Sequence, residues 1–318
     1  MVDNKYVLGI DIGGTKIRLG IVDSNGDVKW GTSKSNYNFD SVSEWINYFT
    51  NNILTQIPDE YTTSYTKIGI GTAGWIDEES NLIIHSPNTN WKNVDLKSLL
   101  EKEINIPISI INDCSAAVIG EHTYGAITDC TNALGIFIGT GIGGGIILNN
   151  NLYQGSQGFA GEIGHTIIVE DGNLCECGRK GCLEAYCGGK AIGKIAKNIA
   201  SIDSNSVFNL LAAKTNKKIT AETVSMAYYE NNEEAVDIIK EISNKLAISI
   251  TNYFNIFDPD AVVIGGGVVD GIPEIVNYID NYFKDLSITE NKHNKIRKGK
   301  LNENMVLVGA SIVARNVI

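Results

Sequence analysis

Leu8-Gly9-Ile10-Asp11-Ile12-Gly13-Gly14-Thr15 recurs later in the chain as Leu134-Gly135-Ile136-Phe137-Ile138-Gly139-Thr140-Gly141. In each copy an apolar run enters a glycine turn, and a second apolar run follows, Ile17 to Val22 in the first copy and Gly145 to Leu148 in the second. This pattern is typical of an antiparallel hairpin. The repeat predicts two lobes built on one plan, unless the two hairpins resemble each other by chance.

Strand-like and helix-like patterns alternate along the rest of the chain, which predicts an α/β architecture. Apolar runs predict strands at Lys67 to Gly71, Ile106 to Asn112 and Ala261 to Ile264. Helical spacing predicts helices at Ser41 to Leu54, Ser115 to Tyr124, Lys190 to Ala200, Val207 to Ala213, Thr220 to Asn231, Glu233 to Phe257 and near Pro273 to Phe283. A final strand and helix are expected within Val306 to Val317.

Length and charge narrow the class of protein. A chain of 318 residues suggests about two domains, and its formal net charge of −11 predicts repulsion from nucleic acid and anionic membranes. We interpret the one basic run, Lys292 to Lys300, as a solvated helix end or loop. No apolar run approaches the ~20 residues that span a bilayer, and Met1 to Tyr6 has no signal-peptide pattern. We therefore expect a soluble, cytoplasmic protein that binds neither nucleic acid nor membranes.

The two glycine turns favour phosphate binding, because glycine lets backbone N–H groups approach phosphate oxygens closely. Placed at matching points of a repeat, they suggest two hairpins that hold a polyphosphate from both sides, with ordinary tight hairpins as the alternative. Neither fits the Walker or dinucleotide patterns, since a strand follows each turn. Asp11 precedes the first turn. It could hold a phosphate-bound Mg²⁺ through water, or be only a polar strand end.

Asn112-Asp113 follows the predicted strand Ile106 to Ile111. The carboxyl end of a strand is the usual place for ligand chemistry in an α/β fold. Asp113 could therefore accept the proton of an attacking hydroxyl, the role that an aspartate plays in protein kinases. It could also cap the helix that begins near Ser115, and the two roles are compatible.

The most specific motif is Cys175-Glu176-Cys177-Gly178-Arg179-Lys180-Gly181-Cys182, with His165 ten residues before the first cysteine. Three thiolates and one imidazole form a closed ligand set that is typical of structural zinc. Reduced cysteines without a metal are the alternative. Glu162 lies three residues before His165, and Glu184 lies two residues after Cys182. Carboxylates held near such a loop suit the hydroxyls of a sugar, although either could be a surface acid.

Together these residues resemble the ROK family (repressor, open reading frame, kinase). The resemblance rests on motifs in the family's order, and it covers nearly the whole chain. The motifs are Asp11 to Lys16, Asn112-Asp113 with Ala116-Ala117, Ile138 to Gly145, Gly161-Glu162-Ile163-Gly164-His165 and Cys175 to Glu184.

The resemblance implies a two-lobed actin-like ATPase (ribonuclease H-like) fold, with a mixed β-sheet flanked by helices in each lobe. We expect residues 1–115 plus 303–318 to form the N-terminal lobe and residues 116–302 the C-terminal lobe. It implies Asp113 as the general base, and sugar binding by Gly74, Asn88, Asn112, Asp113, Glu162, His165 and Glu184. It places ATP, with Mg²⁺, against Asp11, Gly13, Gly14, Thr15, Lys16, Gly139, Thr140, Gly141 and Gly143, and its adenosine near Gly265, Gly266 and Gly267. Structural Zn²⁺ would be held by His165, Cys175, Cys177 and Cys182.

The implied activity is ATP-dependent phosphorylation of a hexose on its primary hydroxyl, with glucose as the leading substrate. Ser86-Pro87-Asn88 with Trp91 is closer to the glucokinase-like members. N-acetylmannosamine, N-acetylglucosamine or fructose are the alternative substrates, and a non-catalytic sugar-responsive regulator is a second alternative. The family's repressors carry an added helix-turn-helix at the amino end, whereas here the first hairpin starts within a dozen residues of Met1. The resemblance also implies a homodimer or homotetramer.

Overall fold

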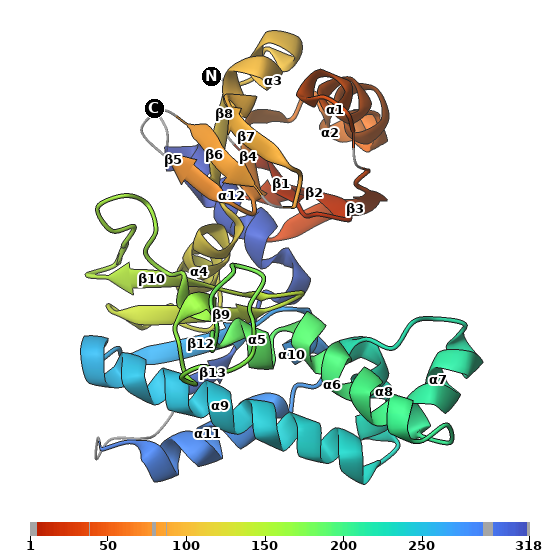
Figure 1. Ribbon diagram of the computed structural model, residues 1–318. Helices are drawn as coiled ribbons and strands as arrows, with labels where there is room; N and C mark the ends of the chain where they lie inside the picture. The colour runs from red at the N-terminus through yellow and green to blue at the C-terminus, as the bar shows by residue number, and fades with distance from the viewer. Residues whose placement is uncertain (1–4, 38, 78–80, 87, 289–294, 317–318) are drawn as a thin grey trace.

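The computed structural model describes residues 5–37, 39–77, 81–86, 88–288 and 295–316. Two five-stranded mixed sheets organise the chain, one in each half of the molecule (Figure 1). The first sheet has the order β3-β2-β1-β4-β8, and the second has the order β11-β10-β9-β12-β13. The first sheet consists of β1 (Tyr6–Ile12), β2 (Lys16–Asp23), β3 (Val28–Ser35), β4 (Tyr65–Thr72) and β8 (Ile108–Asn112). The second consists of β9 (Ala133–Ile138), β10 (Ile142–Leu148), β11 (Asn151–Leu152), β12 (Ala261–Gly265) and β13 (Ile296–Lys298).

The two sheets repeat one connectivity. In each, three consecutive antiparallel strands are followed by two strands that run parallel to the first of them. The glycine turns join the first two strands of each meander, where Ile12 pairs with Ile17 and Ile138 pairs with Ile142. The predicted repeat is therefore confirmed. The second strand begins earlier than expected, at Ile142 rather than Gly145, so only residues 139–141 form the turn.

Two expectations near the end of the chain were wrong. The basic run was interpreted as a helix end or loop, but residues 296–298 form the edge strand β13, which pairs with β12 in parallel. The buried side chain of Ile296 anchors this strand, while its two neighbours remain partly or fully exposed. Lys292 lies outside the described residues. The strand expected near Val306 is instead part of the continuous helix α12 (Met305–Asn316).

A small antiparallel sheet beside the first large one was not predicted. It consists of β5 (Trp75–Asp77), β6 (Leu82–Ser86) and β7 (Trp91–Val94). The register between β5 and β6 shifts at Trp75, as in a β-bulge. Bulges re-aim side chains and are common beside active sites. Because this sheet follows Gly74 and includes Ser86, it carries the segment expected to line the sugar pocket.

Helices cover both faces of each sheet: on the second sheet, α4 (Asp113–Tyr124) packs on one face, and α9 (Glu233–Phe257) and α11 (Ile275–Leu286) pack on the other. The helices of the first half are α1 (Val42–Tyr48), η1 (Phe49–Ile53), η2 (Leu54–Gln56), α2 (Asp59–Thr62) and α3 (Leu96–Ile104). Those of the second half are η3 (Ile163–His165), α5 (Glu184–Cys187), α6 (Gly189–Ile202), α7 (Val207–Thr215), α8 (Ala221–Tyr229), α9 (Glu233–Phe257), α10 (Gly267–Gly271), α11 (Ile275–Leu286) and η4 (Asn302–Asn304). Each half has its own apolar core: Trp45 and Phe49 pack under the first sheet, and Ile239 and Phe283 under the second.

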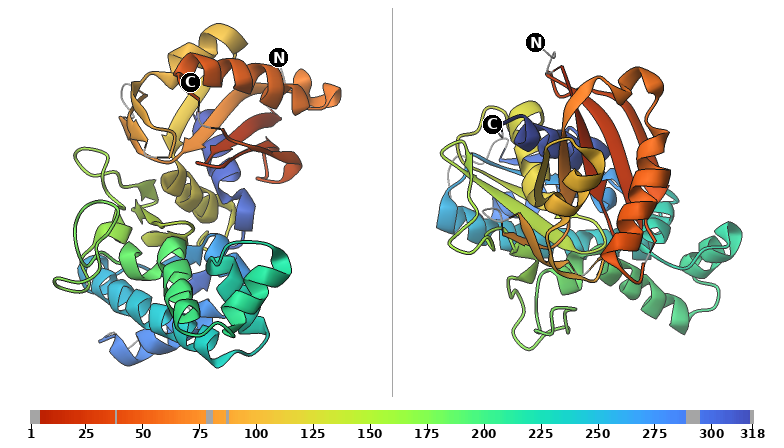
Figure 2. Two further views of the ribbon diagram at one scale, coloured as in Figure 1. Left: turned by 45° about the vertical axis from the view of Figure 1, so that its right-hand side comes forward. Right: turned by 90° about the horizontal axis from the view of Figure 1, so that it is seen from above.

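Two helices connect the halves. Helix α4 (Asp113–Tyr124) follows the last strand of the first sheet, and α12 returns from the second half to the first (Figures 1 and 2). They cross so closely that a Cβ on Gly309 would lie 1.7 Å from the carbonyl oxygen of Ala116. A Cβ on Gly69 in β4 would lie 2.0 Å from the carbonyl oxygen of Ala310. Glycine is therefore required sterically at both points, and α12 is seated directly on the first sheet.

The lobe boundaries at residues 115, 116, 302 and 303 stay a prediction. Among the described residues, helices are all too short or too polar to cross a membrane.

Candidate active site and metal centre

The first glycine turn is held from behind by Asn36. The amide nitrogen of Gly13 donates to the carbonyl of Lys16 at 2.9 Å, closing the turn. Asn36 Nδ2 donates to the carbonyl of Gly13 at 2.7 Å, and the Asn36 backbone N–H donates to Thr15 at 2.9 Å. The indole N–H of Trp45 donates to Asn36 Oδ1 at 3.0 Å and so fixes the Asn36 side chain in this position. With its carbonyls engaged on this side, the turn leaves Thr15 and Lys16 exposed to a ligand.

The second turn is held in a comparable way by the start of α6. The carbonyl of Gly139 accepts the N–H of Gly189 at 2.9 Å, and that of Thr140 accepts the N–H of Lys190 at 3.0 Å. Gly139 and Thr140 are exposed, and a Cβ on Gly139 would meet nothing within 4 Å. The turn therefore presents an open face where backbone could approach a phosphate closely.

The triple glycine packs behind the second turn. Gly266 has a φ of +96°, and a Cβ there would lie 2.7 Å from the carbonyl oxygen of Ile138. Gly265 ends β12, and Gly267 begins α10 and faces open space. Gly143 lies in strand β10, where a Cβ would fall 2.3 Å from the Cys114 sulfur, so it is packed against α4.

Asp11 and Asp113 approach each other between the two turns. Asp11 lies near the end of β1, directly opposite Arg18 of β2, and Asp113 is the first residue of α4. Burial and the nearby charge of Asp113 raise the pKa of Asp11 to about 7, against the opposing influence of Arg18. Burial also raises the pKa of Asp113, although the N–H of Cys114 donates to its Oδ1 at 2.8 Å. Two carboxylates with raised pKa values at one point are typical of a catalytic site.

The cap of α4 is Asn112, not Asp113. Asn112 Oδ1 accepts the N–H groups of Cys114 at 2.9 Å and Ser115 at 3.0 Å. Its Nδ2 donates to the carbonyl of Gly74 at 3.1 Å, which connects the small sheet to the start of α4. Asp113 is thereby free of the capping role that the sequence left open.

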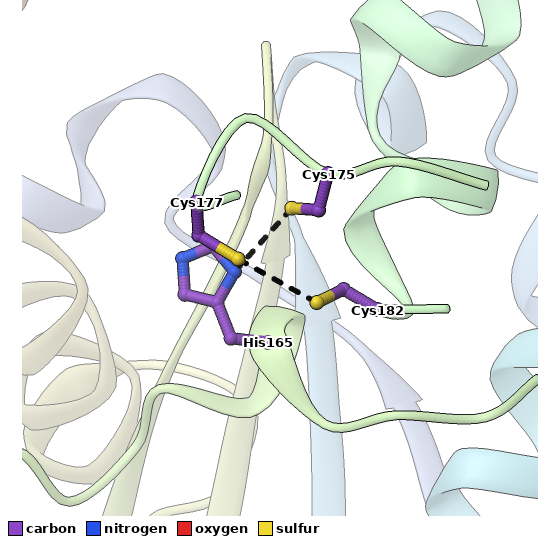
Figure 3. A group of neighbouring side chains, drawn as sticks. All are labelled: His165, Cys175, Cys177 and Cys182. Atoms are coloured by element: carbon purple, nitrogen blue, oxygen red, sulfur yellow. Dashed lines mark hydrogen bonds between the residues drawn. The ribbon is translucent and has the colours of Figure 1, made fainter. Parts of the chain in front are cut away.

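The candidate metal ligands converge. One atom from each of His165, Cys175, Cys177 and Cys182 lies within 4.8 Å of the others, and the four side chains point toward one another (Figure 3). The Cys177 and Cys182 sulfurs are 3.6 Å apart, and the Cys175 sulfur is 3.7 Å from His165 Nδ1. Two Zn–S bonds of about 2.3 Å at a tetrahedral angle separate their sulfurs by about 3.8 Å. The donor set and its spacing therefore fit a structural zinc ion.

The two flanking carboxylates have different surroundings. The Glu162 side chain is 44% exposed and otherwise covered by its neighbours, and its Oε2 lies 3.9 Å from His165 Nε2, the ring nitrogen that faces away from the sulfurs. Burial, with the charges of Asp113 and Glu184, raises the pKa of Glu162, and His165 opposes the shift. Glu184 is half-buried, and its Oε1 lies 3.6 Å from the Cys175 sulfur. The surface-acid alternative therefore does not hold for Glu184.

Asn88 and its neighbours lie beside the first glycine turn, in the half of the molecule opposite to the cysteine loop. A Cβ on Gly14 would lie 3.3 Å from the Asn88 Cβ, so this turn residue meets the first hairpin. Among the described residues, the buried atoms His85 Nδ1, Ser86 Oγ and Thr89 Oγ1 have no hydrogen-bond partner. Unpaired buried polar atoms cost about 1–3 kcal/mol each, so their gathering in one segment suits a site completed by a polyhydroxyl ligand.

Three contributors were missed from the sequence. Arg18 and Cys114 carry no motif of their own: the hairpin register places Arg18 opposite Asp11, and the Cys114 thiol, next to Asp113 in the chain, packs against Gly143 of β10. Asn36 is the third, since it joins a turn 23 residues earlier. An asparagine that follows a strand, as Asn36 follows β3, gives no local signal of such a contact.

Comparison with known proteins identifies relatives over the full length of the chain. The model of the ROK family matches residues 7–317. A glucokinase of Streptomyces coelicolor is 31% identical over 313 residues, covering 97% of both chains. A xylose repressor of Bacillus subtilis is 32% identical over 280 residues, covering 86% of this chain and 67% of the repressor. Among solved structures, a ROK family glucokinase of Streptomyces griseus in complex with glucose and AMPPNP matches with a TM-score of 0.85 and 29% identity, covering 98% of this chain and 100% of the relative. The actin-like fold expected from the sequence is confirmed by this match.

Proposed function

The chain belongs to the ROK family, and from this premise we propose that it transfers the γ-phosphoryl group of ATP to the primary hydroxyl of glucose. Similarity to glucokinases across nearly the whole chain supports a sugar kinase. The observation that carries the proposal is that Asp11 and Asp113 lie close together between two open glycine turns, where burial and the charge of Asp113 raise the pKa of Asp11. Burial and the same charge also raise the pKa of Glu162.

Asp113 is the proposed general base. As the sugar oxygen attacks the γ-phosphorus, its proton passes to the Asp113 carboxylate, a new O–P bond forms and the bond to the β-phosphate oxygen breaks, releasing ADP. The raised pKa of Asp113 makes it a better proton acceptor once ionised. Exposed backbone N–H groups of the two turns would stabilise charge on the phosphates.

The remaining assignments follow the family motifs. We propose that Gly74, Asn88, Asn112, Glu162, His165 and Glu184 bind the sugar hydroxyls. We propose that Asp11, Gly13, Gly14, Thr15, Lys16, Gly139, Thr140, Gly141 and Gly143 bind the phosphates, and that Gly265, Gly266 and Gly267 lie near the adenosine. Asp11 would hold Mg²⁺, which supplies charge neutralisation when bound. His165, Cys175, Cys177 and Cys182 would hold Zn²⁺, which supplies rigidity to their loop.

The lobe division also enters as a proposal. The seating of α12 on the first sheet supports grouping residues 303–318 with residues 1–115, leaving 116–302 as the second lobe. A homodimer or homotetramer is proposed on the family resemblance, and light scattering coupled to size exclusion tests it.

A coupled ADP-release assay with Mg-ATP tests the function against glucose, mannose, fructose, N-acetylglucosamine and N-acetylmannosamine. Turnover that favours glucose is expected. Preference for an N-acetylated sugar or fructose would overturn the substrate while keeping the reaction.

A sugar-responsive regulator is the second candidate, favoured by the similarity to the xylose repressor. Binding of a sugar in calorimetry without turnover of any member of the panel would favour it. The retained Asp113 and both turns argue for catalysis.

A further inference from the structure

An aromatic contact joins the two halves beside the proposed sugar site. The ring of Trp75, on β5 of the first half, lies 5.0 Å from that of Phe159, in the second half, at an interplanar angle of 76°. This is the edge-to-face geometry that aromatic pairs prefer. The imidazole of His85 packs on Trp75 at 5.6 Å. Trp75 is 42% exposed and Phe159 is 39% exposed, so the pair lies at the surface and not in either core.

Phe159 is carried by a closed loop, residues 154–160, that rises from the second half toward β5 (Figure 1). The N–H of Ala160 donates to the carbonyl of Gln154 at 3.0 Å and closes this loop. At its base, a Cβ on Gly161 would lie 2.7 Å from the carbonyl oxygen of Gly144, so the loop is fixed on β10. At its tip, a Cβ on Gly158 would lie 3.4 Å from the carbonyl oxygen of Ile76 in β5.

Both aromatic residues lie close to proposed sugar-binding residues in the sequence. Trp75 follows Gly74, whose carbonyl is bound by Asn112, and Phe159 precedes Glu162 by three residues. The pairing register between β5 and β6 shifts between Trp75 and Ile76, and such irregularities re-aim side chains. The contact therefore links a sugar-binding segment of one half to a sugar-binding segment of the other.

We infer that Trp75 and Phe159 form an aromatic clasp that positions the two sides of the sugar site relative to each other before substrate arrives. This inference rests on the proposed function. The clasp reduces the conformational freedom that sugar binding would otherwise remove. It touches neither turn nor Asp113 in the described contacts, so it acts on sugar affinity rather than on ATP binding or phosphoryl transfer.

The test is a double-mutant cycle on steady-state kinetics with Trp75→Ala, Phe159→Ala and the double variant. Each single change is expected to raise the KM for the hexose by about 2- to 10-fold, the factor that an aromatic pair of ordinary strength supplies. The double variant is expected to resemble the singles, because the contact is already lost. The kcat and the KM for ATP are expected to stay within about 2-fold, and Trp75→Phe is expected to restore most of the sugar affinity.

Tyr153→Ala is the matched control, because this exposed tyrosine precedes the same loop. Circular dichroism and zinc content verify folding of each variant. Additive effects, an unchanged KM, or an equal rise in Tyr153→Ala would overturn the clasp. Wild-type turnover reports the proposed function by itself, so its failure is distinct from that of the clasp. A second cycle, in urea unfolding without ligand, measures the contact independently of turnover, and additivity there would also overturn the inference.

Discussion

The carboxylate of Glu184 reaches back 42 residues to the backbone of Ile142, whose N–H it accepts at 2.8 Å on Oε2. Its other oxygen faces the sulfur of Cys175. One side chain thus joins the cysteine loop to the strand that leaves the second glycine turn. A Cβ on Gly141 would lie 2.1 Å from the same Oε2, so the turn accommodates the carboxylate only because it ends in glycine.

Loss of zinc should therefore affect ATP as well as sugar. In Cys182→Ser, the loop that carries Glu184 loses its metal, and the support of the second turn weakens. We expect substoichiometric zinc by metal analysis and a fall in kcat/KM of about 10-fold or more for both substrates. Cys130→Ala, which removes a buried thiol outside the cluster, should keep its zinc and its activity. A fall in kcat/KM for the sugar alone would show that the contact between Glu184 and Ile142 does not support the second glycine turn.

Replacement of the proposed base should separate binding from turnover. Asp113→Asn preserves shape and an oxygen for the Cys114 N–H, but removes the proton acceptor. We expect kcat to fall by about 10²- to 10⁴-fold, with glucose affinity in calorimetry changed by less than about 3-fold. The exposed carboxylate of Asp40 provides the control Asp40→Asn. Retention of more than a few per cent of the wild-type rate would exclude Asp113 as the base.

The raised pKa of Asp11 predicts a stability cost in the ligand-free protein. In the unfolded chain this carboxyl ionises near 3.8, and in the folded protein near 7. Between these values the unfolded state releases its proton first, so the free energy of unfolding falls as pH rises. Asp11→Asn removes this cost, and it should be more stable than wild type above pH 7 by about 1 kcal/mol or more.

Urea unfolding at pH 4 and pH 8 checks this expectation. The advantage of Asp11→Asn should shrink toward pH 4, where wild-type Asp11 is protonated in the folded state and only partly ionised in the unfolded chain. The same variant should require more Mg²⁺ for activity. A stability difference that does not depend on pH would contradict the assignment.

A methyl group on the second turn should obstruct phosphate and nothing else. A Cβ on Gly139 points into open space, so Gly139→Ala should leave the melting temperature unchanged. If phosphate occupies that space, the KM for ATP should rise by about 10-fold or more, equivalent to about 1.4 kcal/mol. An unchanged KM for ATP in a folded variant would remove this turn from the phosphate site.

A glycine-to-alanine substitution at the crossing of α4 and α12 should instead lower the stability of the protein. Gly309→Ala would drive a methyl group into the backbone of Ala116, so α4 and α12 must separate. We expect a loss of about 1–3 kcal/mol in the free energy of unfolding, measured by urea titration. Gly139→Ala is its matched control, and equal stability of the two variants would show that the crossing is not tightly constrained.

Elements with strong local patterns were predictable from the sequence. Helix α9 has the predicted bounds, because 25 residues of amphipathic spacing begin after Asn232, whose side chain accepts the N–H of Ala235. The convergence of the cysteine loop was also predictable, since its three thiols and His165 lie within 18 residues of sequence and the four donor atoms do come together.

What could not be predicted depends on contacts between distant segments. Strand β13 has three residues in a charged run, and it exists because β12 offers a free edge and the core accepts Ile296. The apolar start of α12 resembles a strand locally, but Gly309 and Ala310 form a helix seated on the first sheet. The pairing of Asp11 with Arg18 and the Trp75–Phe159 contact likewise follow from register and assembly, which no local pattern encodes.

The return of α12 to the first sheet has a consequence for biosynthesis. Strands β1, β4 and β8 emerge from the ribosome long before the helix that covers one of their faces, because the entire second half lies between them in the chain. Until that helix arrives, Gly9, Gly69 and Gly71 line an uncovered surface. The core under the other face lies within residues 8–110 and can assemble early, whereas the face that α12 covers is completed only when the end of the chain has been made.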